Sequence, residues 1–183
     1  MSEDRPSQRK PVYAVAVWGI LGFCAIMANA IWRLLPLAVE PIRDHSLTTM
    51  HVIIYVLWVI FMAYSEGYKG FQKQLSPRMA VRGMYAARNP RPLWVILAPL
   101  FCMGLFHATR RRLIISWTVT IGVIILVIGV RQLDQPWRGI IDGGVVVGLT
   151  WGTLVTLWYG ALALAGHLPD VSPDLPETAA ERG

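Results

Sequence analysis

Long apolar runs alternate with short polar segments along most of the chain. Four runs are long enough for a helix to cross a hydrocarbon core about 30 Å thick. They cover residues 12–32, 47–64, 113–130 and 140–165. The run 113–130 contains no charged residue and lacks the polar face that a helix in a soluble domain would have. The pattern therefore predicts an all-α fold, a multi-pass transmembrane helical bundle with four spans.

A fifth apolar run, residues 93–108, is shorter than the other four. Its 16 residues would form a helix about 24 Å long, and Pro99 lies inside it. A segment of this kind is typical of a short re-entrant or interfacial helix. A complete fifth crossing is the alternative, because the run is uniformly apolar.

Most of the 17 lysines and arginines lie in the segments between the apolar runs. In membrane proteins, the segments on the cytoplasmic side carry more of these residues than the segments on the other side. With the N-terminal tail, residues 1–11, in the cytoplasm, four crossings place more positive charge inside than five crossings do. We therefore expect a cytoplasmic position for the tail, for the basic segment 65–91 and for Arg110, Arg111 and Arg112. Five crossings would place these three arginines outside.

The basic segment 65–91 predicts a short cationic helix at the membrane surface, with a solvated charged helix as the alternative. Ser76-Pro77 resembles a helix start, and Asn89-Pro90 resembles a helix end. The residues expected to bind anionic lipid headgroups are Lys69, Lys73, Arg78, Arg82, Arg88, Arg110, Arg111 and Arg112.

Small residues recur every four positions in the last span. They are Gly144, Gly148, Gly152, Thr156 and Gly160. Such a stripe lets two helix backbones approach closely in lipid, so it predicts helix–helix packing. The opposing helix belongs to this chain or to a partner. Within the chain, Gly22, Ala25 and Asn29 of the first span share a face and are expected to supply the opposing surface.

Ionisable residues within or beside membrane spans are functional candidates. Glu66 and Asp142 are the possible functional carboxylates, although water at the span ends, or Arg138 in the case of Asp142, would also satisfy them. His51 and His107 are weak candidates for haem ligands. They could face each other only if all five runs cross.

Composition narrows the classes of function. Charged residues make up 15% of the chain, and its net charge of +6 comes without a nucleic-acid-binding motif, so no nucleic-acid partner is expected. Cys24 and Cys102 lie in apolar runs and predict buried thiols. The sequence contains no recognisable catalytic or metal-binding motif, so we expect no catalytic residues, metal or cofactor. The C-terminal tail, residues 167–183, reads as disordered.

These observations predict an accessory, assembly or scaffold component, rather than an enzyme, that acts by helix packing and a basic cytoplasmic face. The alternatives are a haem-binding redox membrane subunit and a small transporter or lipid-handling protein. The expected partners are membrane lipids with anionic headgroups and either further copies of the chain or another membrane protein. Compactness and the charge bias favour the bacterial inner membrane.

Overall fold

The computed structural model describes residues 12–176, and this part of the chain is helical without any strand. The four membrane-length helices predicted from the sequence are confirmed by length and composition. The N-terminal tail, residues 1–11, and residues 177–183 lie outside the described part. The elements are α1 (Tyr13–Arg43), α2 (Thr49–Met62), the π-helix η1 (Ala63–Leu75), α3 (Ser76–Arg88), α4 (Pro92–Ile96), α5 (Ala98–Met103), α6 (Arg110–Val130) and α7 (Trp137–Leu164).

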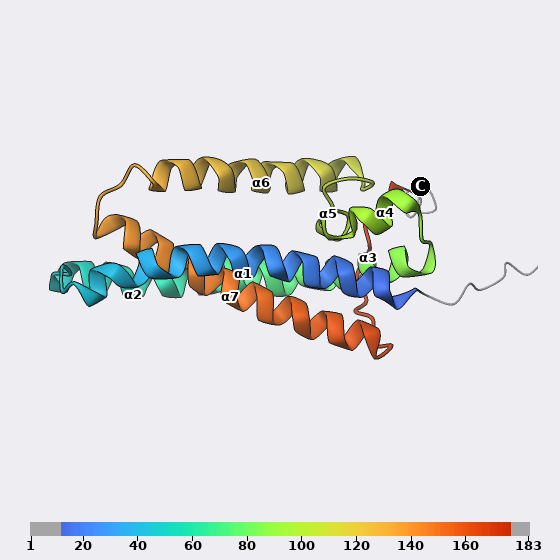
Figure 1. The fold of residues 1–183 in the computed structure, drawn as a ribbon, viewed down its shortest axis with the longest axis horizontal. Coiled ribbons are helices and arrows are strands. Elements are labelled where there is room, and N and C mark those ends of the chain that lie inside the picture. Colours follow the sequence, from blue (N-terminus) through green and yellow to red (C-terminus); the bar gives the residue numbers. More distant parts are fainter. Residues whose placement is uncertain (1–11, 177–183) are drawn as a thin grey trace, which may run out of the picture.

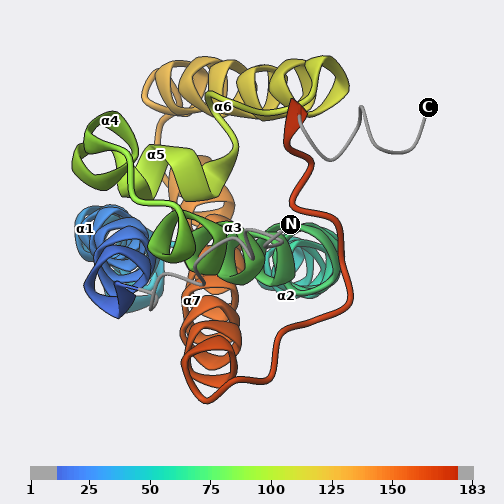
Figure 2. The ribbon, with the colours of Figure 1, turned by 90° about the vertical axis from the view of Figure 1, so that its right-hand side faces the viewer.

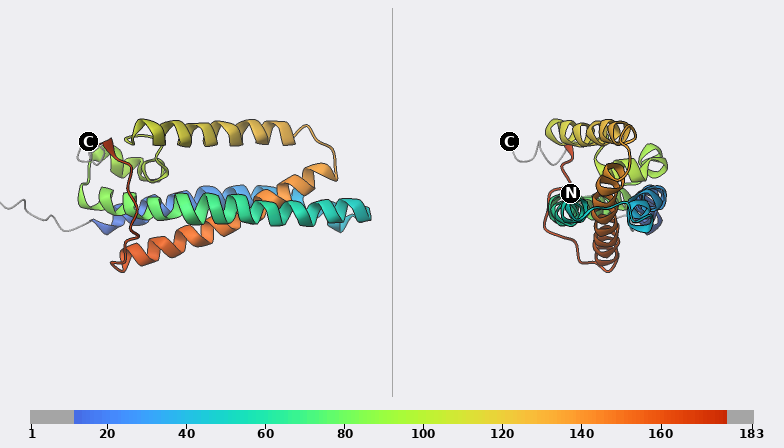
Figure 3. Two further views of the ribbon diagram at one scale, coloured as in Figure 1. Left: turned by 180° about the vertical axis from the view of Figure 1, so that it is seen from behind. Right: turned by 90° about the vertical axis from the view of Figure 1, so that its left-hand side faces the viewer.

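Successive long helices run in opposite directions (Figure 1). The elements α2, η1 and α3 follow one another without a break, and we call this 40-residue helix the rod. Figure 3 shows the rod from behind as one continuous helix. The helix α7 crosses between α1 and the rod and contacts both (Figure 2). The start of α1, the end of the rod, α4, α5 and the start of α6 share one end of the molecule, which we call the α5 end.

The rod differs from the prediction of a span followed by a separate surface helix. The predicted bounds agree with α3, which begins at Ser76 and ends before Asn89-Pro90, but the backbone of Ser76 is helical, so α3 continues η1 and Ser76 does not cap it. The Ser76 hydroxyl is 2.8 Å from the hydroxyl of Thr156 on α7, where it is buried. Alanine, glycine and methionine side chains of α3 also pack against α1 and α7. One face of α3, in the second half of the basic segment, is therefore part of the bundle interior, because its small residues allow close packing.

The first helix is longer than the predicted span and continues to Arg43. Pro36 and Pro41 lie inside α1, although prolines often end helices. Pro41 is buried against α7, where it contacts the position of Gly139. Packing against α7 thus extends a helix that the prolines alone would shorten.

The run 93–108 forms the two short helices α4 and α5 rather than one helix. The backbone of Leu97 leaves the helical region, and Pro99 follows in the first turn of α5. Gly104, with φ +76°, ends α5 in the left-handed conformation that glycine adopts easily. Neither α4 nor α5 is long enough to cross a membrane.

The helix α6 packs little against the rest of the described chain. Ser116 and Val130 are its buried residues. Two hydrogen bonds tie its first half to the end of α5 and the loop after it: Ser116 Oγ donates to the Met103 carbonyl, and Trp117 Nε1 donates to the Leu105 carbonyl. Figure 1 and Figure 2 show α6 lying apart from α1, α7 and the rod, inclined to α1.

The tail was predicted to be disordered, but residues 167–176 have a defined path. The end of α7 also lies at the α5 end, and from there these residues run along the outside of the molecule toward the start of α6 (Figure 2). Leu175 is fully buried there in a cluster with Val15, Trp94 and Phe101. One apolar side chain in a polar segment thus helps to hold the described part of the tail in place.

Candidate functional site

The small residues of α7 all face inward. Gly144, Gly148, Gly152, Thr156 and Gly160 are buried. The rod supplies most of the surface against them: a β-carbon at position 152 would lie within 2.6 Å of three ring carbons of Phe71. At position 160 the neighbour is Ile20 of α1. Small side chains at these positions let α7 approach the rod closely.

The predicted opposing face on α1 lies elsewhere. Gly22 faces Pro99 of α5, whose Cγ would be 2.5 Å from a β-carbon at position 22. The first and last spans do contact each other, but the α7 stripe lies mainly against large side chains of the rod. Aromatic side chains, rather than a second row of small residues, complete the contact.

Glu66 lies on η1 opposite Gly148. A β-carbon at position 148 would lie 2.6 Å from Glu66 Oε2, so glycine leaves the room that the carboxyl group occupies. Oε2 is buried and has no hydrogen-bond partner among the described residues. An unpaired carboxyl oxygen inside a bundle is unfavourable, so Glu66 remains a functional candidate.

Contacts on both sides establish how deep η1 lies along the bundle. Phe71 packs against Phe23, with 6.4 Å between the ring centroids, and Phe23 is near the middle of the apolar run 12–32. Trp151 Nε1 donates a 3.0 Å hydrogen bond to Gln72 Oε1, and Trp151 is near the middle of the run 140–165. The π-helix is therefore level with the centres of the first and last apolar runs.

The exposed side of η1 carries two tyrosines and two lysines in a stacked row. The rings of Tyr64 and Tyr68 stack with centroids 5.9 Å apart. Lys69 Nζ lies 5.0 Å from the Tyr64 centroid, and Lys73 Nζ lies 5.3 Å from the Tyr68 centroid. Each lysine follows its tyrosine by five residues, the spacing that a π-helix aligns. We call these four residues the tyrosine–lysine ladder.

Both lysines of the ladder are exposed, and they lie beside Phe71 and Gln72 rather than at the end of a span. Their predicted contact with lipid headgroups is therefore not supported by their position along the bundle. Arg88, Arg110 and Arg111 are exposed at the α5 end, where headgroups could reach them.

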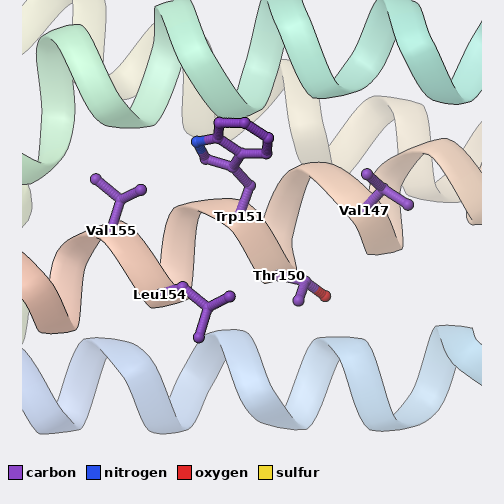
Figure 4. Close-up of a pocket in the computed structure, with 5 residues that line it drawn as sticks. All are labelled: Val147, Thr150, Trp151, Leu154 and Val155. Carbon is purple, nitrogen blue, oxygen red and sulfur yellow. The ribbon is translucent and has the colours of Figure 1, made fainter.

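Two shallow apolar grooves lie along the outer face of α7. The larger, about 350 Å³, is lined by Val147, Thr150, Trp151, Leu154 and Val155 (Figure 4). A smaller one of about 220 Å³ lies between α7 and α1 and shares Thr150 and Leu154 with the first. Their lining is apolar apart from the hydroxyls of Thr150 and Thr153 and the indole N–H of Trp151, which are hydrogen-bonded within the protein.

At the α2 end of the bundle, His51 and Asp142 have structural partners. Thr48 and His51 form a reciprocal cap at the start of α2. The His51 ring meets the Trp137 ring edge-on, with 5.1 Å between centroids. Asp142 is 5% exposed, and its Oδ2 lies 3.8 Å from Arg138 Nε. These contacts account for His51, whereas Asp142 Oδ2, like Glu66 Oε2, is buried without a hydrogen-bond partner among the described residues, so Asp142 also remains a functional candidate.

His107 lies at the other end of the molecule, where its ring packs against Trp94 and Phe101. Because His51 and His107 lie at opposite ends, one haem cannot bind both, and the haem pairing is wrong. In the described part of the chain, no group of three or more His, Cys, Asp or Glu residues could hold a metal ion.

Arg82, predicted to bind headgroups, is instead 1% exposed at the α5 end. Its Nε donates to the Phe101 carbonyl at 2.7 Å, and its Nη1 donates to the Pro173 carbonyl at 2.8 Å. Its Nη2 donates to the carbonyls of residues 106 and 107. The guanidinium thus links α3, α5, the loop before α6 and the C-terminal tail.

Asp174 and Cys102 complete the surroundings of Arg82. Arg78 Nε lies 3.2 Å from Asp174 Oδ2, and the Asp174 carbonyl accepts a 2.8 Å hydrogen bond from the Thr109 backbone. Burial raises the pKa of Cys102 to about 12, partly offset by the positive charge of Arg82, so this cysteine stays a thiol. The sequence analysis missed Asp174 because its segment reads as a polar tail.

Comparisons with protein-family models, with curated proteins and with solved structures found no match. The fold itself defines the class: an all-helical protein with four helices long and apolar enough to cross a membrane.

Proposed function

We propose that the protein is an accessory or assembly component of a membrane, and that it binds a second membrane protein through the tyrosine–lysine ladder. The observation that carries this proposal is the depth of the ladder. Lys69 and Lys73 are exposed on a segment level with the centres of two apolar runs. Charged side chains in that position are unfavourable toward lipid, and a protein partner would remove them from it.

The positive charge of the tyrosine–lysine ladder favours a partner with an acidic side chain. Its two cations have aromatic partners but no carboxylate within salt-bridge distance among the described residues. A partner helix with an acidic side chain at the same depth would complete the pairing. A second copy in a symmetric dimer would place lysine against lysine, so a different protein is the proposed partner.

The orientation follows from the charges at the two ends. We propose that the α5 end faces the cytoplasm of a bacterial cell, with the protein in the inner membrane and the arginines Arg88, Arg110 and Arg111 at anionic headgroups. An accessory role by packing also agrees with the buried small residues of α7, which stabilise the bundle that presents the ladder.

Site-specific photo-crosslinking tests the proposal. A photoreactive amino acid replaces Lys69 in the full chain, expressed in its native membrane. A matched variant carries it at Ile26, which is exposed on α1 at a similar depth. We expect an adduct with another protein at position 69 and lipid adducts at position 26. The double substitution Lys69→Leu and Lys73→Leu should abolish the protein adduct formed from position 68.

Two results would contradict the proposal. One is lipid adducts at position 69, which would mean that the ladder faces hydrocarbon. The other is an adduct of twice the monomer mass whose peptides all come from this chain, which would mean that the protein assembles with itself. An acidic residue in the cross-linked peptide of a different protein would identify the pairing carboxylate.

A further inference from the structure

Three arginines lie near one carboxylate at the α5 end, and Arg78 forms an ion pair with it. Arg78 and Arg82 are one turn apart on α3, and Arg112 comes from the first turn of α6. Arg78 lies 3.2 Å from Asp174, and Arg112 interacts electrostatically with both Arg78 and Asp174. Arg82 interacts with Arg112 and Asp174 in the same way. The three guanidinium groups form one cluster around a residue of the C-terminal tail.

The cluster has more positive charge than its carboxylate can balance. Three cations lie near one anion, with which Arg78 is paired, and Arg112 packs over Gly104, whose missing side chain leaves it room. Mutual repulsion among partly buried cations is unfavourable unless anions offset it. Arg82 is held in place by four hydrogen bonds to carbonyl groups, so the position of its charge is fixed.

The tail is held at the cluster in a strained conformation. Asp174 has φ +53°, in the left-handed region that non-glycine residues rarely adopt. His107, whose carbonyl accepts from Arg82, has φ +48°. Strain of this kind persists only where surrounding contacts enforce it. Here the contacts are those of the arginines, of the Thr109 backbone and of buried Leu175.

We propose that Arg78, Arg82 and Arg112 form a binding site for a phosphate group, and that Asp174 occupies this site from within the chain as a competing anion. A phosphate carries more negative charge than one carboxylate and offers several acceptor oxygens to guanidinium groups. Arg78 and Arg112 are partly exposed and would bind it directly, whereas Arg82 would offer its Nη1, which loses the Pro173 carbonyl as acceptor when residues 172–176 leave. The proposal does not depend on the ladder or its partner.

The phosphate could belong to an anionic lipid headgroup or be free in solution, and the experiment separates the two. The full-length protein is reconstituted with phosphatidylglycerol or with phosphatidylcholine, and in a third arm it is kept in neutral detergent with inorganic phosphate. Binding is followed as the shift in melting temperature, and tail release as the rate of proteinase K cleavage before residue 176. Both signals should rise with phosphatidylglycerol. A rise with inorganic phosphate as well would show that the site binds free phosphate too.

Three substitutions make the test specific. Asp174→Asn removes the competing charge and should tighten phosphate binding by roughly fivefold, the size of one exposed ion pair. Arg112→Gln should weaken it by a similar factor, as should Arg78→Gln, whose side chain is near the surface. Arg111→Gln is the matched control, since it removes the same charge from an exposed neighbouring position. Equal effects of Arg111→Gln and Arg112→Gln, or unchanged or weaker binding by Asp174→Asn, would overturn the proposal.

Discussion

Replacing Gly152 by alanine tests the packing of α7 against the rod. The added methyl group would lie within 2.6 Å of three ring carbons of Phe71. Phe71 is 8% exposed and packs against Phe23, so its ring has little freedom to move. Overpacking typically costs about 1–3 kcal/mol, whereas alanine regains about 1 kcal/mol of helix propensity. Because the ring is confined, we expect a net loss of about 2 kcal/mol in the free energy of unfolding.

The assay is unfolding of the purified protein in mild detergent by added denaturing detergent, followed by circular dichroism. Gly122→Ala on α6 is the matched control, because a β-carbon at position 122 has no neighbour within 4 Å. It should leave stability unchanged or raise it slightly. Phe71→Leu should reduce the loss caused by Gly152→Ala in a double-mutant cycle, since the two groups touch. Equal midpoints for Gly152→Ala and Gly122→Ala would refute the close contact between α7 and the rod.

Three further predictions concern buried polar groups. Arg82→Lys removes the guanidinium that binds four carbonyl groups and should lower the free energy of unfolding by about 3 kcal/mol. The control Arg88→Lys, at an exposed position of α3, should have little effect in the same assay. Thr156→Val should cost about 1 kcal/mol because it leaves the Ser76 hydroxyl without its partner, whereas Thr150→Val removes a bond within its own helix and should cost less. Cys102 should resist alkylation by a maleimide at neutral pH in the folded protein, because burial raises its pKa to about 12 and leaves almost no thiolate. Rapid labelling before unfolding would contradict this prediction and show that the thiol is accessible.

The sequence predicts which segments form the membrane-length helices better than it predicts how long these helices are. The last two spans, 113–130 and 140–165, agree closely with α6 and α7 because uniform apolar runs leave little choice. The first two were too short. Hydropathy ends a span where polar residues begin, but the backbone stays helical through Pro36 and through Glu66 because neighbouring helices pack against both stretches.

The candidate functional residues also divide into those whose positions the sequence predicts and those whose positions it does not. The four-residue spacing in α7 identifies its packing face, since spacing alone decides which side chains share a helix face. What opposes that face could not be predicted, because it depends on the path of the rod. The burial of Arg82 depends in part on Pro173, 91 residues later in the chain, and Leu175 docks in a cluster that includes Val15 of the first helix. No local pattern in the sequence encodes them.

The π-helix makes the orientation of α3 depend on the number of residues between positions 63 and 75. An α-helix repeats every 3.6 residues, so removing one residue turns everything beyond it by about 100°. The 13 residues of η1 are wound more loosely, and the side of α3 that faces the bundle depends on their number. A chain one residue shorter between positions 63 and 75 would turn Arg82 away from the carbonyl groups it binds, even with every other side chain unchanged. Relatives of this protein should therefore vary more readily in the identity of these residues than in how many there are.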